Sequence, residues 1–199
     1  MYTPRHFRSA APWQELMRRH AFGLLITVSG DELWTTHLPY LVSDDGEAVR
    51  MHMARANPHW KATEQHPRCR FVVQGEHAYV SPDWYDTPES VPTWNYEAIH
   101  VEGRVELSFD EEALWQLLVE MAARFEEPDA AWKLDRLSEA FRRPRLKNIV
   151  GVTLFVECGE AKQKLSQNRS AAERRRIAEE LRQRGDGRLA DVIEALDSD

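Results

Sequence analysis

The sequence predicts an α+β protein, a small and mostly antiparallel β-barrel with peripheral helices and a C-terminal helical tail. Short apolar or alternating segments crowd between residues 24 and 107 and are joined mostly by tight turns, whereas helical patterns dominate after residue 108. This order lacks the strand-helix alternation of a parallel sheet, and closure of a strand meander into a barrel removes its unpaired edges. We expect about seven strands and five helices.

The first elements are a helix and a hairpin. Pro12 suits the first turn of a helix, and the apolar stripe that follows it extends to His20. Gly30-Asp31 is a tight-turn sequence between two strand-like runs, 24–29 and 32–37. A helix followed by a β-hairpin is therefore expected over the first 37 residues.

A third strand and a short helix come next. Val49, Met51 and Met53 alternate with polar residues, which is typical of a half-buried strand over 48–53. Asn57-Pro58 joins a favoured N-cap to a favoured first helical residue and predicts a helix over 58–66. Further strands are expected at 69–74, 77–81 and 94–107, and an ordered loop is expected over Ser81–Pro92.

Helices dominate the second half. Ser108 and Glu111 have capping-box spacing ahead of an apolar stripe that ends at Phe125. A shorter helix is expected from Asp129 to about Arg142, where Pro144 stops it, and a last strand is expected at 149–156. Ser170-Ala-Ala-Glu173 is a second capping box, and it opens a helix that Gly185 and Gly187 separate from a final one over 189–196.

The domain organisation follows from the absence of a linker. No Gly/Ser-rich or Pro-rich stretch interrupts the chain, and no internal repeat is present. We therefore expect a barrel domain with inserted helices over 1–169 and a helical tail over 170–199 that packs on the same domain.

Composition excludes several classes of protein. The chain has 26 basic and 33 acidic residues, a net charge of −7, which argues against general coating of nucleic acid. No run of 18 apolar residues and no signal-peptide core are present, so a cytoplasmic protein without membrane contact is expected. Two cysteines are too few for a disulfide scaffold or thiolate zinc site, and no zinc, P-loop, Gly-x-Ser-x-Gly or Gly-x-Gly-x-x-Gly motif occurs.

One segment is suited to phosphate. A strand end, an arginine, an N-cap asparagine and further cations surround a predicted helix N-terminus over residues 52–61. Helix N-termini and guanidinium groups both bind anions, so a phosphate-bearing ligand is one interpretation. The other interpretation is a capped helix with surface cations.

Two further segments are rich in binding groups. Residues 81–96 concentrate large aromatic rings beside polar side chains, as expected either of a planar-ligand site or of an aromatic core corner or dimer interface. Residues 162–169 carry many phosphate- or carbonyl-binding side chains, although a solvated turn has similar composition. The triplet Arg174-Arg175-Arg176 suggests DNA contact, yet neighbouring glutamates favour a salt-bridged helix face.

These motifs together resemble a known family. They run in order along the chain, from Met1-Tyr-Thr-Pro-Arg-His-Phe7 to Lys164-Leu-Ser-Gln-Asn-Arg169. Between them lie Leu38-Pro39, His52-Met-Ala-Arg-Ala-Asn-Pro-His-Trp60, Ala78-Tyr-Val-Ser-Pro-Asp-Trp-Tyr85, and Val91-Pro-Thr-Trp-Asn-Tyr96. The set resembles the PaiB family, described as FMN-binding negative transcriptional regulators.

The resemblance implies a fold, a cofactor and an assembly. It implies an FMN-binding split β-barrel of the pyridoxamine-phosphate-oxidase-like superfamily, a homodimer with flavin sites between subunits, and a 52–61 corner that faces the FMN phosphate. No metal ligand is expected, and catalytic residues are not assigned. The residues expected to bind the cofactor are His52, Arg55, Asn57, His59, Trp60, Lys61, Ser81, Trp94, Asn95, Gln167 and Arg169.

Three functions are compatible with these observations. The first is an FMN-binding negative transcriptional regulator that resembles repressors of sporulation and protease-production genes and reaches DNA directly or through a partner. The second is a flavin-dependent oxidoreductase of the same superfamily. The third is a haem-handling split barrel, for which the histidines of the first 100 residues supply candidate axial ligands.

Overall fold

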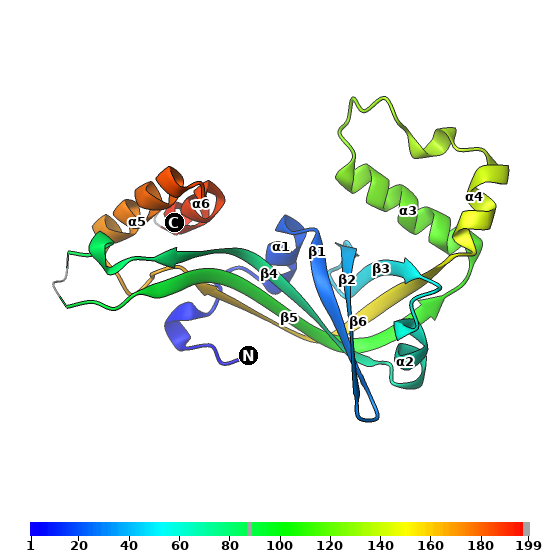
Figure 1. Ribbon diagram of the computed structural model, residues 1–199, viewed down its shortest axis with the longest axis horizontal. Helices are drawn as coiled ribbons and strands as arrows, with labels where there is room; N and C mark the ends of the chain where they lie inside the picture. Colours follow the sequence, from blue (N-terminus) through cyan, green and yellow to red (C-terminus); the bar gives the residue numbers. More distant parts are fainter. Residues whose placement is uncertain (87–88, 197–199) are drawn as a thin grey trace. The chain divides into compact units, whose positions relative to one another are not determined.

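The computed structural model describes residues 1–86 and 89–196 of the chain. Within that part it contains six strands and six α-helices, together with three short 3-10 helices (Figure 1). The predicted numbers, about seven strands and five helices, are therefore each wrong by one. Residues 87–88 of the predicted loop and 197–199 of the predicted tail lie outside the described residues.

All strand pairs given by the structure are antiparallel, and the strands follow the closed order β1-β2-β3-β6-β5-β4. This order confirms the predicted α+β fold. The strands are β1 (Phe22–Ser29), β2 (Glu32–Val42), β3 (Ala48–Ala54), β4 (Arg68–Val80), β5 (Thr93–Ser108) and β6 (Ile149–Lys164). The α-helices are α1 (Trp13–Arg19), α2 (His59–Gln65), α3 (Glu111–Phe125), α4 (Glu139–Leu146), α5 (Ala171–Arg184) and α6 (Gly187–Ala195).

The chain forms two compact units. The barrel unit comprises Met17–Val72 and Val101–Gly159, and the strand-end unit comprises Met1–Leu16, Val73–His100 and Glu160–Asp199. The long strands β4, β5 and β6 therefore each contribute one part to the barrel unit and another to the strand-end unit. The predicted division at residue 169 stays a prediction.

Apolar alternation builds the barrel unit. Val49, Met51 and Met53 of β3 are buried, as their spacing predicts, and β3 pairs with β6 along its whole length. Gly103 lies where β5 meets β6, and a Cβ at this position would stand 1.8 Å from the carbonyl oxygen of Phe155. Only a glycine permits so close an approach of these two strands.

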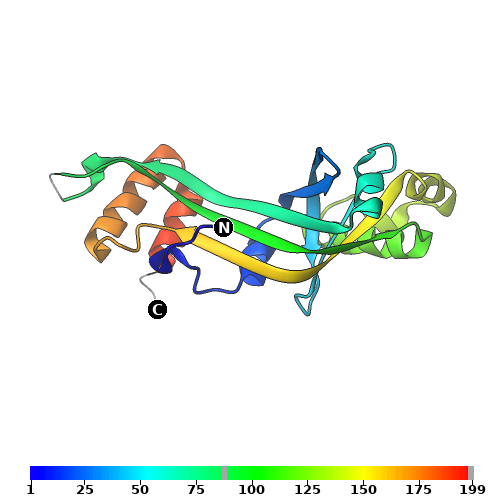
Figure 2. The same cartoon turned by 90° about the horizontal axis from the view of Figure 1, so that it is seen from below.

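Helices α5 and α6 form the core of the strand-end unit with the outer part of β4. The two helices lie side by side over these strand ends in both views (Figures 1 and 2). Ser170 and Glu173 make the predicted capping box, and Gly185 ends α5 with a φ of 94°. The buried apolar residues of this core are Ala78, Val80, Trp84, Tyr85, Leu165, Ile177, Ala178, Leu181, Leu189, Ala190 and Ile193.

Several element boundaries differ from the predictions. The two strands expected at 69–74 and 77–81 are one strand, β4, and the strands expected at 32–37 and 149–156 extend to Val42 and Lys164. Each strand continues past the end of its apolar alternation, because neighbouring strands still form hydrogen bonds with its backbone groups.

Two predicted helix ends are also wrong. The capping box at Ser108 is not formed, because β5 continues through Ser108 and Asp110 caps α3 by accepting from the Ala113 amide at 2.8 Å. The helix expected from Asp129 to Arg142 instead begins after Ser138, whose side chain caps it, and Pro144 lies inside α4.

Candidate functional site

The predicted cofactor-binding residues fall into two groups. Those from His52 to Lys61 belong to the barrel unit, and those from Ser81 to Arg169 belong to the strand-end unit.

The first group lies at the corner between β3 and α2. The Arg55 amide donates to the Asn148 carbonyl at 2.8 Å, and the Asn57 amide donates to the Ala54 carbonyl at 2.9 Å. The Asn57 side chain accepts from the His59 amide at 3.1 Å and donates to the Thr36 hydroxyl at 3.0 Å. Asn57 thus fixes the corner, although α2 begins one residue later than predicted.

His59 is a buried structural residue of this corner. Its ring is 0% exposed, Nδ1 lies 2.7 Å from the Thr36 hydroxyl, and Nε2 lies 2.9 Å from the Thr27 hydroxyl. Burial lowers its pKa, so the neutral ring is the stable form. His59 therefore anchors α2 to the strands and offers no exposed surface to a ligand, contrary to the role that the motif suggested.

Two cations and two aromatic rings share the exposed side of the corner. We call Arg55, Trp60, Lys61 and Phe109 the corner cluster. The guanidinium carbon of Arg55 lies 4.8 Å from the centre of the Phe109 ring, which meets the Trp60 ring edge to face at 5.5 Å. The Lys61 ammonium lies 5.6 Å from the Trp60 ring.

The corner cluster carries uncompensated positive charge. Arg55 donates to the Lys147 carbonyl at 3.4 Å, and the Trp60 indole donates to the Arg55 carbonyl at 2.9 Å. Among the described residues neither Arg55 nor Lys61 forms an ion pair with a carboxylate. The α2 helix has only seven residues and its first amide is occupied by Asn57, so anion binding here rests on the two side-chain cations.

The His52 side chain lines a cavity that does not include the corner cluster. Together with Trp115, Phe141 and other apolar residues of α3 and α4 it lines a cavity of about 180 Å³. Its buried Nδ1 has no hydrogen-bond partner, and burial lowers its pKa. The structure therefore does not bring His52 together with Arg55 and Lys61.

The second group surrounds a pocket of about 150 Å³ in the strand-end unit. Of the predicted residues, Asn95 and Arg169 line it. The remaining lining residues come from four motif segments: Phe7, Tyr85, Val91, Thr93, Lys164, Ser166 and Asn168.

Hydrogen bonds hold the pocket walls. The Asn95 amide donates to the Ser166 hydroxyl at 3.0 Å, and Ser166 has a positive φ of 62°. The Lys164 ammonium donates to the Thr93 hydroxyl, and burial lowers its pKa. The guanidinium carbon of Arg169 lies 3.9 Å from the centre of the Tyr85 ring, so a cation stacked on an aromatic face forms one wall.

The other predicted residues of this unit do not line the pocket. Ser81 caps a 3-10 helix, Pro82–Trp84, by accepting from the Asp83 amide. Gln167 braces its own turn with bonds to Leu165 and Gln163. Trp94 is 52% exposed and packs against His77 and Tyr79.

The sequence predictions omitted several residues of both places. Phe109 completes the corner cluster, and Phe7, Tyr85, Thr93 and Lys164 complete the pocket of the strand-end unit. All of these residues except Phe109 lie in the motif segments. The motifs could therefore have indicated them, although no spacing between residues within a motif pointed to any one of them.

Two searches of the described residues found no candidate. Within residues 1–86 and 89–196 no group of three or more potential ligands is arranged to hold a metal ion. In the same part of the chain no helix combines the length and the apolarity needed to cross a bilayer.

Comparison with known proteins identifies the family. Residues 1–158 match the family described as "Putative FMN-binding domain". The chain is 32% identical over 185 residues to "Protease synthase and sporulation protein PAI 2" of Bacillus subtilis. The match covers 91% of this chain and 89% of that protein. It is 30% identical over 129 residues to the uncharacterized protein YKL070W of Saccharomyces cerevisiae, which covers 52% of this chain and 76% of that one.

Two solved structures share the fold. The FAD and heme binding protein of Mycobacterium smegmatis has a TM-score of 0.62 at 15% identity and covers 84% of this chain and 77% of that one. The flavocytochrome Anf3 of Azotobacter vinelandii has a TM-score of 0.62 at 15% identity. The match covers 81% of this chain and 72% of that one.

The fold and the family match define an FMN-binding split-barrel protein. The chain belongs to the PaiB family. The predicted family, split β-barrel and FMN-binding domain are confirmed.

Proposed function

We propose that this protein is a cytoplasmic, homodimeric, FMN-binding negative regulator of transcription. The name of the Bacillus subtilis relative, which links it to protease synthesis and sporulation, supports the regulatory role. The observation that carries the flavin part is the corner cluster, where two cations that form no ion pair within the described part of the chain adjoin two aromatic rings.

The donor set of the corner fits the phosphate and the planar ring of FMN. Arg55 and Lys61 would hold the phosphate, because a guanidinium binds it through two parallel hydrogen bonds and an ammonium adds a point charge. Trp60 and Phe109 offer apolar faces to a planar ring, while Asn57 keeps the corner in position. When bound, FMN supplies a ring that accepts and donates electrons.

Exposed apolar side chains support a homodimer. Phe22, Val28 and Leu33 of the β1-β2 hairpin are each more than half exposed, and Val28 pairs with Leu33 across the hairpin. Val28 and Leu33 thus form an exposed apolar pair, of the kind that contributes to association surfaces. A second copy of the chain is the occupant that the family resemblance implies.

The charge of the protein helps to distinguish direct binding to DNA from action through a partner protein. The net charge is −7, and Arg176 of the arginine triplet forms an ion pair with Asp86 at 2.6 Å. Both features favour action through a partner protein over direct contact with DNA. Gel-shift assays across a salt series separate the two, because direct contact predicts strong retention at low salt.

The oxidoreductase and haem alternatives predict different observations. An oxidoreductase turns over a reduced nicotinamide in the presence of FMN, and a haem protein shows a Soret band. The printed descriptions of the Mycobacterium smegmatis and Azotobacter vinelandii structures mention haem or cytochrome, so both assays belong beside flavin binding.

Titration of the flavin-free protein with FMN and riboflavin tests the proposed phosphate contacts. Riboflavin lacks the phosphate, so FMN should bind at least about tenfold more tightly to the unaltered protein. Arg55→Gln and Lys61→Gln should weaken FMN and leave riboflavin nearly unchanged. Arg68→Gln, at a side chain that is 70% exposed, is the matched control. Equal affinities for the two flavins would contradict the assignment.

A further inference from the structure

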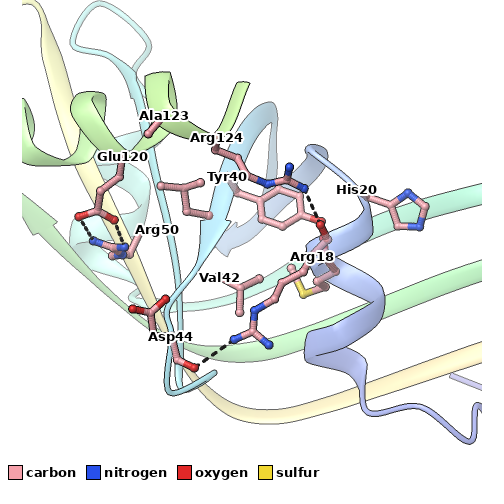
Figure 3. A pocket seen from close by; sticks show the side chains of 11 residues that line it. Arg18, His20, Tyr40, Val42, Asp44, Arg50, Glu120, Ala123 and Arg124 are labelled. Carbon is pink, nitrogen blue, oxygen red and sulfur yellow. Dashed lines mark hydrogen bonds and ion pairs between the residues drawn. The ribbon is translucent and has the colours of Figure 1, made fainter. Parts of the chain in front are cut away.

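A pocket of about 570 Å³ lies in the barrel unit, away from the corner cluster. It is bounded by the end of α1, the β2-β3 hairpin and α3, whose side chains point toward a common space (Figure 3). Its volume falls within the range of about 300 to 1,000 Å³ that is usual for small-molecule sites. Neither the flavin proposal nor the family resemblance assigns a role to this pocket.

The floor of the pocket is buried and fixed. Met17 and Tyr40 are almost completely buried, and the Tyr40 hydroxyl donates to the Met17 carbonyl at 2.8 Å. Burial raises the pKa of the Tyr40 phenol despite the nearby Arg124 charge, so the phenol stays neutral. Leu41 and Val42 add apolar surface beside it.

Backbone carbonyls hold two arginines at the rim. Arg18 donates through Nη2 to the carbonyls of Ser43 at 2.8 Å and Asp44 at 3.2 Å. Arg124 donates through Nη2 to the Arg18 carbonyl at 2.6 Å. In the described part of the chain neither guanidinium forms an ion pair, and the hydrogen bonds given for each use only one of its nitrogens.

The remaining charges of the pocket nearly cancel. Arg50 pairs with Glu120 through two contacts, one of them 3.1 Å long, and Asp44, whose carbonyl accepts from Arg18, also lines the pocket. The lining therefore carries three guanidinium groups against two carboxylates. A guanidinium held by backbone carbonyls keeps its full charge and its other N–H donors for an anion.

We propose that this pocket binds a small organic anion, with its carboxylate or phosphate held by Arg18 and Arg124 and its apolar body against Tyr40 and Val42. The site is separate from the corner cluster. The β2-β3 turn that contributes Asp44 precedes β3 and Arg55 follows it, so the seven residues of β3 set them about 20 Å apart. The inference does not depend on flavin binding.

Methyl NMR of the full-length protein labelled at methionine provides the test. The chain has five methionines, and only Met17 lines the pocket, so its methyl signal reports on ligands there. The probes are benzoate and phenyl phosphate, which share a phenyl ring and differ in the acid, with benzyl alcohol as the uncharged match. Substitution of Met17 by leucine assigns the signal.

Both anions, or one of them, should move the Met17 signal saturably below about 10 mM, and benzyl alcohol should not. Binding to one anion alone identifies the preferred acid group. Arg18→Gln and Arg124→Gln should each weaken the response about tenfold or more, because each removes a charged hydrogen-bond donor. Arg104→Gln, at an exposed arginine of β5 outside the pocket, should leave it unchanged.

Three results would overturn the proposal: no saturable shift with either anion, an equal shift with benzyl alcohol, or an undiminished shift in both arginine variants. The other methionine signals show whether each variant is folded, and Arg124→Lys, which keeps the charge, should retain part of the response. FMN titration of the same samples separates failure of this site from failure of the flavin site.

Discussion

Replacing His59 by alanine should strongly destabilise the barrel unit. The change removes two hydrogen bonds of the buried ring, a partly buried one to Thr36 at 2.7 Å and a buried one to Thr27 at 2.9 Å. Each contributes about 1 kcal/mol net, and the cavity left by the ring costs a further 1 to 2 kcal/mol or so. We expect a loss of about 3 to 4 kcal/mol in the free energy of unfolding, a large fraction of a typical domain's stability.

Urea unfolding followed by tryptophan fluorescence measures this loss. Trp34 stacks near the His59 ring at 6.1 Å and reports directly on the site. His66→Ala is the matched control, because His66 is exposed at the end of the same helix and its side chain carries no hydrogen bond in the structure. A loss below about 1 kcal/mol for His59→Ala would show that the buried network does not hold α2.

The same residue gives a pH dependence with a definite sign. Burial lowers the pKa of His59, and also that of His52, below the ordinary value of 6.5. The unfolded chain therefore binds more protons below that pH, so stability is complete above about 6.5 and falls as the pH decreases toward the folded-state values. The slope of stability against pH between 5 and 7 should be smaller in His59→Gln; an unchanged slope would contradict the assignment.

Other predictions concern the strands and the tail. Gly103→Ala should cost more than about 3 kcal/mol or prevent folding, because its Cβ would meet the Phe155 carbonyl at 1.8 Å. Gly187→Ala, at an open helical position, should instead stabilise the protein by up to about 1 kcal/mol, and thermal unfolding compares the two. Ser170→Ala should lower stability by about 1 kcal/mol through loss of the capping box with Glu173, as urea unfolding would show; no change would mean that the cap is dispensable.

Local chemistry explains which parts of the fold could be predicted. The Gly30 turn, the alternation in β3 and the capping box at Ser170 depend on residues close in sequence, and all three are observed. The cap of α3 could not be chosen in the same way, because Ser108 and Asp110 are both good caps. The choice depended on how far β5 remains paired in the barrel.

The residues of the candidate sites likewise differ in whether residues close in the sequence determine their position. Arg55, Trp60 and Lys61 lie in one short motif, so their cluster could be anticipated. The burial of His59 could not, because its partners Thr27 and Thr36 come from a hairpin more than twenty residues earlier in the chain. The pocket at Arg18 and Arg124 was likewise invisible to motif analysis, since its lining comes from four separate elements.

The visible spectrum of the purified protein, with identification of any released flavin, tests the central claim most directly. We expect the absorption bands of an oxidised flavin, with FMN as the released compound, or their appearance after incubation with FMN and removal of the excess. A colourless protein that retains no FMN after this treatment would contradict the assignment of this chain as an FMN-binding regulator.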